Sequence, residues 1–405
     1  MILAKIAFRN IFRQKRRSFL TGLTMAVGFA LLSVSISISE GTYDNVINMF
    51  TRAYTGHVQI NKKGYLDKPS LYRTFDDIDY LGGKIENVKH VKSWSPRIFA
   101  SALSFIGKKT TVARIVGIDP KKESETTTIE KKIAKGRYLS LKPKKEVMIG
   151  GVLAEILNAD VGDELVLISQ GADGSIANDI FKISAILKGD SSSLERINCY
   201  MHVEDAQEFL ELYNRYHEII ILLDDFSRSF EIAAQLRQVI KNPDLDIQPW
   251  EKVHRQFYET MMADKEGMWI ALLIIVIIVA IGVLNTVLMA ILERTPEFGV
   301  LKALGTKPRQ ILSMIILETS FLSLMAIAAG LIISVIANYI LRGHGINYPE
   351  PVDLSGFVVT TLYGSLKLKV FLIPSLITFI TAIAVSIIPA VRAMRIVPVK
   401  AMRAH

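Results

Sequence analysis

The sequence predicts an α-helical membrane protein with four transmembrane helices plus a large extracytoplasmic mixed α/β domain. Two observations lead to this fold class. Half of the 405 residues are hydrophobic, and many of them lie in four long apolar runs. About half of the chain lies outside those runs, which is enough for one domain with a core of its own.

Each apolar run is long enough to cross a bilayer, which needs about 20 residues of helix. The third run is interrupted only by Glu318 and the fourth only by Arg392. The first run could instead be a cleaved signal peptide, but the 21 uncharged residues Phe19–Ser39 exceed the roughly 7–15 of a signal core. The predicted membrane spans are 18–40, 268–292, 311–340 and 370–394.

Basic residues gather at the predicted membrane ends and set the orientation. Residues 1–17 hold six Lys/Arg and no acid, 292–310 hold four basic and two acidic residues, and 391–405 hold four basic residues. Because Lys and Arg accumulate on the cytoplasmic side, both termini and the 293–310 loop are expected there, with the domain and the 341–369 loop opposite. This pattern accounts for the net charge of +9 without a nucleic-acid partner.

The segment 41–267 is expected to form the external domain and its connections to the membrane. Helices over 40–54 and 251–265 are rich in neither Gly, Ser nor Pro, so a paired stalk is expected rather than flexible linkers. The two last strands and the helix between them form a predicted β-α-β unit, and 110–200 is a strand-rich candidate subdomain. Strands are predicted at 57–60, 109–119, 164–169, 217–223 and 245–248, and helices at 151–158 and 229–240.

The cytoplasmic loop predicts a short surface helix over 296–304. Thr295 is a good N-cap, Pro296 suits the first helical position, and Glu297 lies where the helix dipole favours a carboxylate. Gly305 suits the left-handed position that ends a helix. Such a helix either lies among lipid headgroups or docks into a groove of a soluble partner. The residues expected to form its apolar edge are Phe298, Leu301 and Leu304.

This loop resembles the coupling region of FtsX-like ABC transporter permeases, which carry E-R-x-x-E-[FI]-G-x-x-[KR]-A-[LI]-G. The segment Pro389–Arg403 is similar to the family's P-A-x-x-A-x-x-x-x-P-x-x-A-L-R ending, with Met402 where Leu is usual. Residues 7–17 are similar to its basic lead-in, and the N-terminal half resembles a MacB-like periplasmic core. The resemblance implies these ATPase-coupling residues: Glu293, Arg294, Pro296, Glu297, Phe298, Gly299, Leu301, Lys302, Leu304 and Gly305.

The resemblance implies the permease subunit of a mechanotransmission ABC transporter in the bacterial inner membrane. Residues 56–60 and 63–65 look closest to the lipoprotein-releasing (LolC/LolE) branch, so a lipoprotein or other lipid-anchored substrate is expected. The chain has no G-x-x-x-x-G-K-[ST] phosphate loop, so ATP and Mg²⁺ are expected on a separate ATPase. We expect no enzyme activity, cofactor or metal on this chain. The implied partners are two ATPase copies, a second permease chain that is identical or different, membrane lipid, and a periplasmic lipoprotein carrier or adaptor.

Two alternatives of different class stay open: MacB-like efflux of small molecules or peptides, and an FtsX-type regulator of a periplasmic hydrolase. A membrane enzyme is disfavoured because the seven His residues form no close pair and no HExxH motif. Cys199, the single cysteine, is expected to be a buried hydrophobe. Glu318 is expected to snorkel or to bond to a neighbouring helix rather than to relay protons.

A lipid-binding cleft is predicted where the first two spans meet. Its candidate residues are large and apolar, and Ser33, Ser35, Ser37 and Ser39 add polarity nearby, with helix packing as their alternative role. The candidate substrate-binding residues are Met25, Leu31, Met268 and Leu272.

Overall fold

The computed structural model describes residues 2–13, 15–188, 196–354 and 357–396. The chain divides into two compact units, each with its own hydrophobic core. The membrane unit comprises 1–45, 262–350 and 360–405, and the domain unit comprises 46–261 and 351–359.

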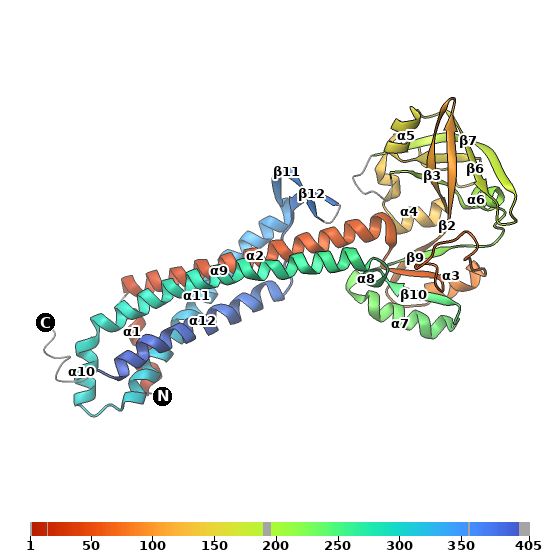
Figure 1. Ribbon diagram of the computed structural model, residues 1–405. Coiled ribbons are helices and arrows are strands. Elements are labelled where there is room, and N and C mark those ends of the chain that lie inside the picture. Colours follow the sequence, from red (N-terminus) through yellow and green to blue (C-terminus); the bar gives the residue numbers. More distant parts are fainter. Residues whose placement is uncertain (1, 14, 189–195, 355–356, 397–405) are drawn as a thin grey trace. The chain divides into compact units, whose positions relative to one another are not determined.

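Long helices make up most of the membrane unit. Within the described ranges, four stretches are long and apolar enough to cross a membrane: Ser18–Thr55, Arg255–Glu293, Pro308–His344 and Lys369–Met394. Each of them contains one of the four predicted spans. Figure 1 shows the helices α1 (Ile2–Arg13), α2 (Lys15–Phe50), α9 (Arg255–Glu293), α10 (Thr295–Ala303), α11 (Pro308–His344) and α12 (Lys369–Met394). The strands β11 (Ile346–Leu354) and β12 (Phe357–Leu362) pair between α11 and α12.

Small residues let the membrane helices approach closely. A side chain at Gly330 of α11 would place a Cβ 2.7 Å from Phe29 and 2.9 Å from the backbone oxygen of Ala26, both on α2. Gly28 of α2 faces Val279 of α9 in the same way. Without water to expel, helices in a bilayer associate through such van der Waals contact.

Strands and helices alternate along the domain unit. The strands are β1 (Val58–Lys62), β2 (Val91–Ile106), β3 (Lys109–Ile118), β4 (Ile133–Gly136), β5 (Glu146–Ile149), β6 (Glu164–Gln170), β7 (Ile176–Leu187), β8 (Asn198–His202), β9 (Glu218–Leu223) and β10 (Leu245–Pro249). The helices are α3 (Ile78–Glu86), α4 (Pro120–Thr126), α5 (Gly151–Leu157), α6 (Val203–Leu210), α7 (Ser229–Ile240) and α8 (Trp250–Val253), with short helical turns η1 (Thr51–Thr55), η2 (Ile129–Lys132) and η3 (Phe226–Arg228).

One half of this sheet has the strand order β10-β1-β9-β2, and all three pairings are antiparallel. The predicted β-α-β unit is present, since β9 and β10 are parallel and joined by α7, but β1 lies between its two strands. The two connections β1-α3-β2 and β9-α7-β10 interleave as a split β-α-β arrangement. The residue patterns of β9 and β10 predicted that both are strands. Their neighbours in the sheet could not be predicted locally, because β10 pairs with β1, almost 200 residues earlier in the sequence.

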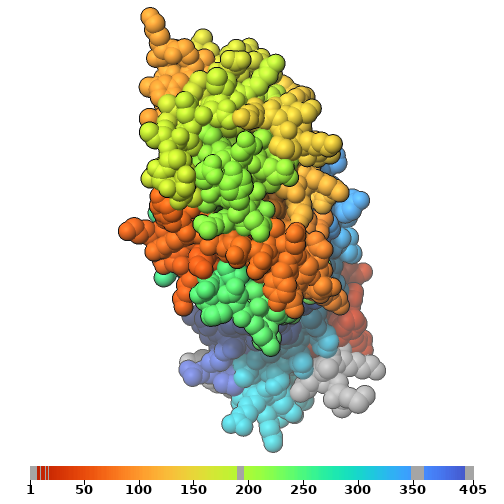
Figure 2. Space-filling model, turned by 90° about the vertical axis from the view of Figure 1, so that its right-hand side faces the viewer, coloured from red at the N-terminus to blue at the C-terminus, as the bar shows by residue number. Residues whose placement is uncertain are grey.

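The strand-rich region closes on itself. Strands β2, β3, β8, β5, β7 and β6 pair in turn, and β6 pairs back with β2. The ring is not a separate insertion, since β2 pairs with β9 through its first half and with β3 and β6 through its second. Figure 2 shows the surface of this region, where the orange hairpin around residue 107, between β2 and β3, projects outward.

Contacts between α2 and α9 occur in both units. In the domain unit the rings of Phe50 and Phe257 stack with centroids 4.2 Å apart. In the membrane unit Lys265 pairs with Glu40 at 2.8 Å. Because Glu40 is also paired with Lys369 of α12, its buried carboxylate has two cationic partners. These contacts agree with the paired helices that the sequence predicts at the two ends of the domain.

A buried ion cluster ties the end of α2 to the sheet of the domain unit. The Arg97 side chain, 2% exposed, pairs with Glu123 of α4 at 2.5 Å and with Glu218 of β9 at 3.5 Å. Arg97 Nη1 also donates to the Tyr54 carbonyl at 2.5 Å, in the helical turn that follows α2. Burial acts to lower the pKa of the Arg97 guanidinium, but the neighbouring Glu123 and Glu218 together outweigh it and raise that pKa. Burial raises the pKa of Glu218.

Candidate functional site

The predicted surface helix is α10, and its boundaries follow from the end of α9. Arg294 is the N-cap residue, Thr295 is already helical, and Gly305 follows the helix with φ of +91°. The expected N-cap at Thr295 is therefore wrong by one residue. Its hydroxyl instead donates to the Ile291 carbonyl at 3.0 Å, because the last carbonyls of α9 lack helical partners of their own.

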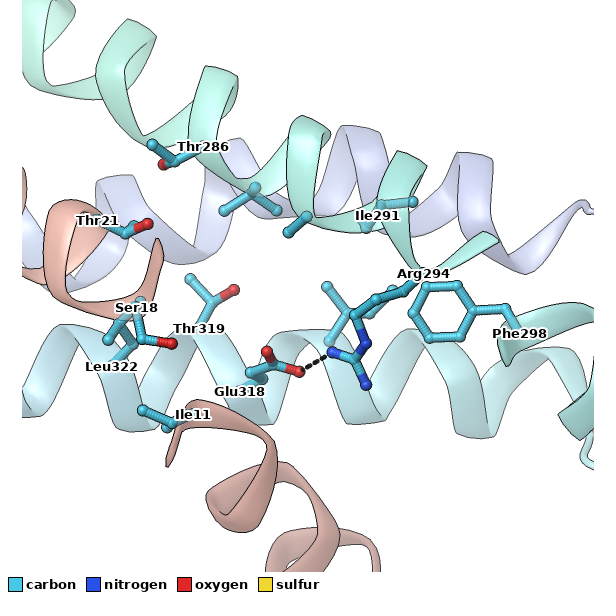
Figure 3. Close-up of a pocket in the computed structure, with 13 residues that line it drawn as sticks. Ile11, Ser18, Thr21, Thr286, Ile291, Arg294, Phe298, Glu318, Thr319 and Leu322 are labelled. Atoms are coloured by element: carbon cyan, nitrogen blue, oxygen red, sulfur yellow. Dashed lines mark hydrogen bonds and ion pairs between the residues drawn. The ribbon is translucent and has the colours of Figure 1, made fainter. Parts of the chain in front are cut away.

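Arg294 joins α10 to α11 through a nearly buried ion pair. Its Nη1 lies 2.8 Å from Glu318 Oε2, and its Nε lies 3.1 Å from Glu297 Oε2. Figure 3 shows the guanidinium pointing from the end of α9 toward Glu318 on α11. The Arg294 side chain is 9% exposed and its guanidinium also lies over the Phe298 ring. Charges in such surroundings are stable only when paired, so the pair fixes Arg294 against α11.

A small cavity with a mixed polar and apolar lining adjoins this ion pair. It measures about 40 Å³ and is lined by Ser18 and Thr21 of α2, Thr286 of α9, and Glu318 and Thr319 of α11 (Figure 3). A polar cavity above about 10–15 Å³ has room for a hydrogen-bonded water molecule. The cavity thus places several hydroxyl groups and room for water beside Glu318, in a lining that also includes apolar side chains such as Phe298 and Leu322.

Two further polar contacts hold α10 against other helices of the membrane unit. Lys302 Nζ donates to the carbonyls of Met394 at 3.1 Å and Ile396 at 2.7 Å, at the C-terminal end of α12. A cation is favoured there because the helix dipole is negative at that end. Arg13 of α1 pairs with Glu297 at 3.4 Å, where both side chains are partly exposed. Helix α10 therefore contacts α1, α11 and α12 through charged groups.

The expected apolar edge of α10 is split between two faces. Phe298 is only 1% exposed and packs with Ile311, Met314 and Ile315 of α11 in the core of the membrane unit. Leu304 is 79% exposed. Leu304 comes six residues after Phe298, and at about 100° of helical rotation per residue it points about 120° away from Phe298 around the helix axis. Leu304 also lies just after the last helical residue.

The other predicted coupling residues divide between these two faces. Leu301 packs against the same core and Gly299 is buried. Val300, which was not among the predicted residues, is 47% exposed. Glu293 is exposed and Pro296 is half-buried. The face available to a partner is thus formed by Val300 and Leu304, while Arg294, Phe298 and Lys302 hold the helix in place.

The chain matches two family models: the MacB-like periplasmic core domain over residues 18–239 and the FtsX-like permease C-terminal over residues 269–398. The first covers more than half of the chain. The protein belongs to the FtsX-like permeases that carry a MacB-like periplasmic core. It is an ABC transporter permease of the LolC/LolE and MacB type, and its spans and domain fit an inner-membrane permease with a large periplasmic domain.

Relatives of the permease carry names from both branches. It is 22% identical to a lipoprotein-releasing system transmembrane protein LolC of Neisseria meningitidis, covering 83% of this chain and 82% of that protein. It is 21% identical to a LolE of Haemophilus influenzae, covering 95% and 94%. A macrolide export ATP-binding/permease protein MacB of Shewanella oneidensis is 21% identical over 89% of this chain but only 57% of that protein.

The four predicted substrate-binding residues of the permease differ in burial. Met25 is fully buried in one cluster with Val279 and Val283, and Leu272 is buried in another with Leu32 and Val370. Leu31 is 53% exposed and Met268 is half-buried. A shared cleft formed by these side chains remains a prediction.

Two serines of α2 make specific hydrogen bonds. The sequence left open whether these serines add polarity near a cleft or pack helices together. Ser33 Oγ accepts from the Asn338 amide of α11 at 3.2 Å. The Ser37 hydroxyl donates to the Ser365 carbonyl at 2.9 Å and accepts from the Ser365 N–H at 2.8 Å. These contacts favour the packing role for both serines. Asn338, the one amide side chain within the third span, was a polar signal that the sequence analysis missed.

The described part of the domain unit has no group of three or more His, Cys, Asp or Glu residues placed to hold a metal ion. Cys199 is fully buried, as expected, and burial raises its thiol pKa to about 12. His57 and His217 each accept a backbone hydrogen bond at Nδ1, from Leu223 and Phe99. These side chains therefore have structural surroundings rather than those of a reactive site.

Proposed function

We propose that this permease transmits the closure of a separate ATPase dimer to the membrane helices and thereby moves a lipoprotein, or another lipid-anchored molecule, out of the inner membrane. The observation that supports this most is the anchoring of α10 on α1, α11 and α12 by charged contacts. A helix that merely rested among headgroups would not need three such contacts.

In the proposed mechanism the ATPase pushes on the outward face of α10, at Val300 and Leu304. Because Arg294 is paired with Glu318, displacement of α10 pulls on α11. Lys302 transmits the same displacement to the end of α12. Helix α9 follows directly, since a single residue separates it from α10. Two ATPase chains and a second permease chain, identical or different, complete the proposed assembly.

The proposed substrate class rests on the lipoprotein-releasing relatives, which align with 83% and 95% of the chain. The MacB relative is longer, and its name includes an ATP-binding part. This chain has no phosphate loop, so a separate ATPase, with ATP and Mg²⁺ bound there, suits it better. The basic segments support termini in the cytoplasm and the domain in the periplasm. Efflux of small molecules or peptides is the second candidate.

Reconstitution distinguishes these functions. The permease, co-expressed with its ATPase and any second permease chain, would be placed in proteoliposomes with an acylated lipoprotein. We expect ATP-dependent release of the lipoprotein and stimulation of ATP hydrolysis by it. Stimulation by small toxic compounds alone would instead favour efflux, and stimulation by a periplasmic hydrolase would favour a regulator.

Glu297→Lys is the matched variant for this assay. It places a cation between Arg294 and Arg13, which both contact Glu297 now. We expect normal membrane insertion, continued ATP hydrolysis and loss of release. Unchanged release by this variant would remove the proposed role of α10.

Apolar side chains on the strand ring offer a docking surface for the proposed periplasmic carrier. Leu103 of β2 lies opposite Val112 of β3, and both are about half exposed. Ile180 of β7 lies opposite Val166 of β6 and is 51% exposed. Exposed apolar clusters of this kind often mark interaction sites. Leu103→Asp should lower delivery to a carrier while leaving ATP hydrolysis unchanged; unchanged delivery would place the carrier elsewhere.

A further inference from the structure

An apolar groove runs along the surface of the membrane unit between the N-terminal helices and α11. Its volume is about 340 Å³. The side chains that line it include Phe12 of α1, Phe19 and Leu23 of α2, and Met325 and Ile333 of α11, and they are almost all hydrophobic. The groove adjoins the Arg294–Glu318 cavity, and Ile11, Ser18 and Leu322 border both.

The dimensions of the groove suit a single acyl chain. On α11 its lining extends from Leu322 to Ile333, which is roughly 16 Å of helix at 1.5 Å per residue. One leaflet contributes about half of the roughly 30 Å hydrocarbon core. The groove is therefore about as long as one leaflet of the hydrocarbon core is thick.

A positive charge lies where the groove meets the start of α2. Lys15 lines the groove, and its neighbour Arg16 is exposed. Among the residues that the structure describes, no acidic side chain pairs with either of them, whereas Arg13 pairs with Glu297. Basic residues near a membrane surface attract anionic lipids by about 1 kcal/mol each.

We propose that this groove binds one acyl chain of an anionic phospholipid, with the headgroup phosphate on Lys15. The lipid comes from the leaflet that faces the N-terminus. The site does not depend on which substrate the permease moves. Its long axis along α2 and α11 would make the packing of these two helices sensitive to the lipid composition of that leaflet.

Fluorescence quenching by brominated lipids tests this site in the full-length chain. A tryptophan reporter at Met325 lies in the groove, and Leu324→Trp is the matched control, since Leu324 is the next residue, is 53% exposed and does not line the groove. Both variants carry Trp269→Phe to remove the native tryptophan on α9. Each is reconstituted in phosphatidylcholine containing a small fraction of brominated phosphatidylglycerol or brominated phosphatidylcholine.

We expect brominated phosphatidylglycerol to quench the Met325→Trp reporter at least threefold more strongly than brominated phosphatidylcholine. The Leu324→Trp control should show no such preference, and Lys15→Gln should abolish it at Met325→Trp. Ile333→Trp gives a second groove reporter should Met325→Trp fold poorly. Equal quenching by the two lipids in the groove would overturn the proposal. Weak quenching by both there, with normal quenching of the control, would show that protein covers the groove and would also overturn it.

Discussion

The permease contains two buried arginines that each anchor the end of a helix, and the two differ in how completely they are enclosed. Arg97 of the domain unit is 2% exposed and is shared by two carboxylates and the Tyr54 carbonyl. Arg294 of the membrane unit is 9% exposed, and its carboxylate partners Glu318 and Glu297 are 16% and 40% exposed.

This difference indicates different tasks. A fully enclosed cluster such as that of Arg97 cannot open without leaving charges unpaired in an apolar interior, so it fixes the sheet on the turn after α2. The Arg294 pair adjoins a small cavity, and its carboxylate partners are partly exposed to solvent, so its rearrangement costs less. We infer that the domain anchor transmits force rigidly and that the membrane anchor is the joint that adjusts.

The largest expected effect comes from removing the rigid anchor. Arg97→Met leaves Glu123 and Glu218 buried without their cation, and breaking a buried pair in this way costs about 3–5 kcal/mol. The thermal midpoint of the full-length protein in detergent should fall sharply. Arg97→Lys, which keeps the charge but loses the forked geometry, should fall less. An unchanged midpoint in Arg97→Met would remove the distinction between the two anchors.

Acidification should weaken the domain through three of its histidines. Burial lowers the pKa values of His57, His217 and His254 to about 4. In the unfolded chain these histidines bind protons near pH 6.5, whereas in the folded domain they stay neutral down to about pH 4. The free energy of unfolding is therefore unaffected by them above pH 6.5 and falls between pH 6.5 and 4 by about 1.4 kcal/mol per pH unit for each histidine.

Thermal midpoints measured between pH 7 and pH 4.5 check this dependence of stability on pH. His254→Gln removes one of the three groups and should make the decline shallower by about a third. A pH-independent midpoint, or an unchanged slope in His254→Gln, would contradict this assignment.

Breaking the membrane anchor should affect coupling more than folding. Glu318→Leu leaves Arg294 paired only with Glu297, and we expect substrate release per ATP hydrolysed to fall on the order of tenfold, equivalent to about 1.4 kcal/mol. Glu318→Gln keeps a hydrogen bond and should lose less. The exchange Arg294→Glu with Glu318→Arg should recover part of the loss, which a purely local packing defect would not.

The smallest effect is expected from an exposed pair at the start of α9. Arg255 lies 2.6 Å from Glu259, but both side chains are largely in solvent. Such pairs contribute little because water screens them. Arg255→Ala should therefore leave both the thermal midpoint and release within error. A clear loss of substrate release in Arg255→Ala would mean that exposed charges on α9 contribute to coupling, contrary to the view that the two buried arginines carry it.

The elements most accessible from sequence were those with long regular patterns. The four apolar runs and strands such as β3 and β9 have periodicities that local residues determine. Strand β2 was missed because Pro96 and several polar residues interrupt its pattern, and Pro is tolerated there only through its particular pairing with β9.

The candidate site was predictable as a helix but not in its orientation. Pro296 and Gly305 mark where α10 begins and ends from local preferences alone. Which way Phe298 points depends on its contacts with α11, and the partner of Glu318 lies 24 residues away in sequence. The end of the C-terminal motif, 397–403, lies outside the described residues.

The most direct test of the account is a cross-link from the exposed face of α10 to the co-expressed ATPase. The only native cysteine, Cys199, is fully buried, so a new cysteine reports without background. Leu304→Cys should cross-link to the ATPase with a short thiol-to-amine reagent, and Phe298→Cys, buried against α11, should not. No cross-link at Leu304→Cys in a complex that hydrolyses ATP and releases substrate would contradict the account.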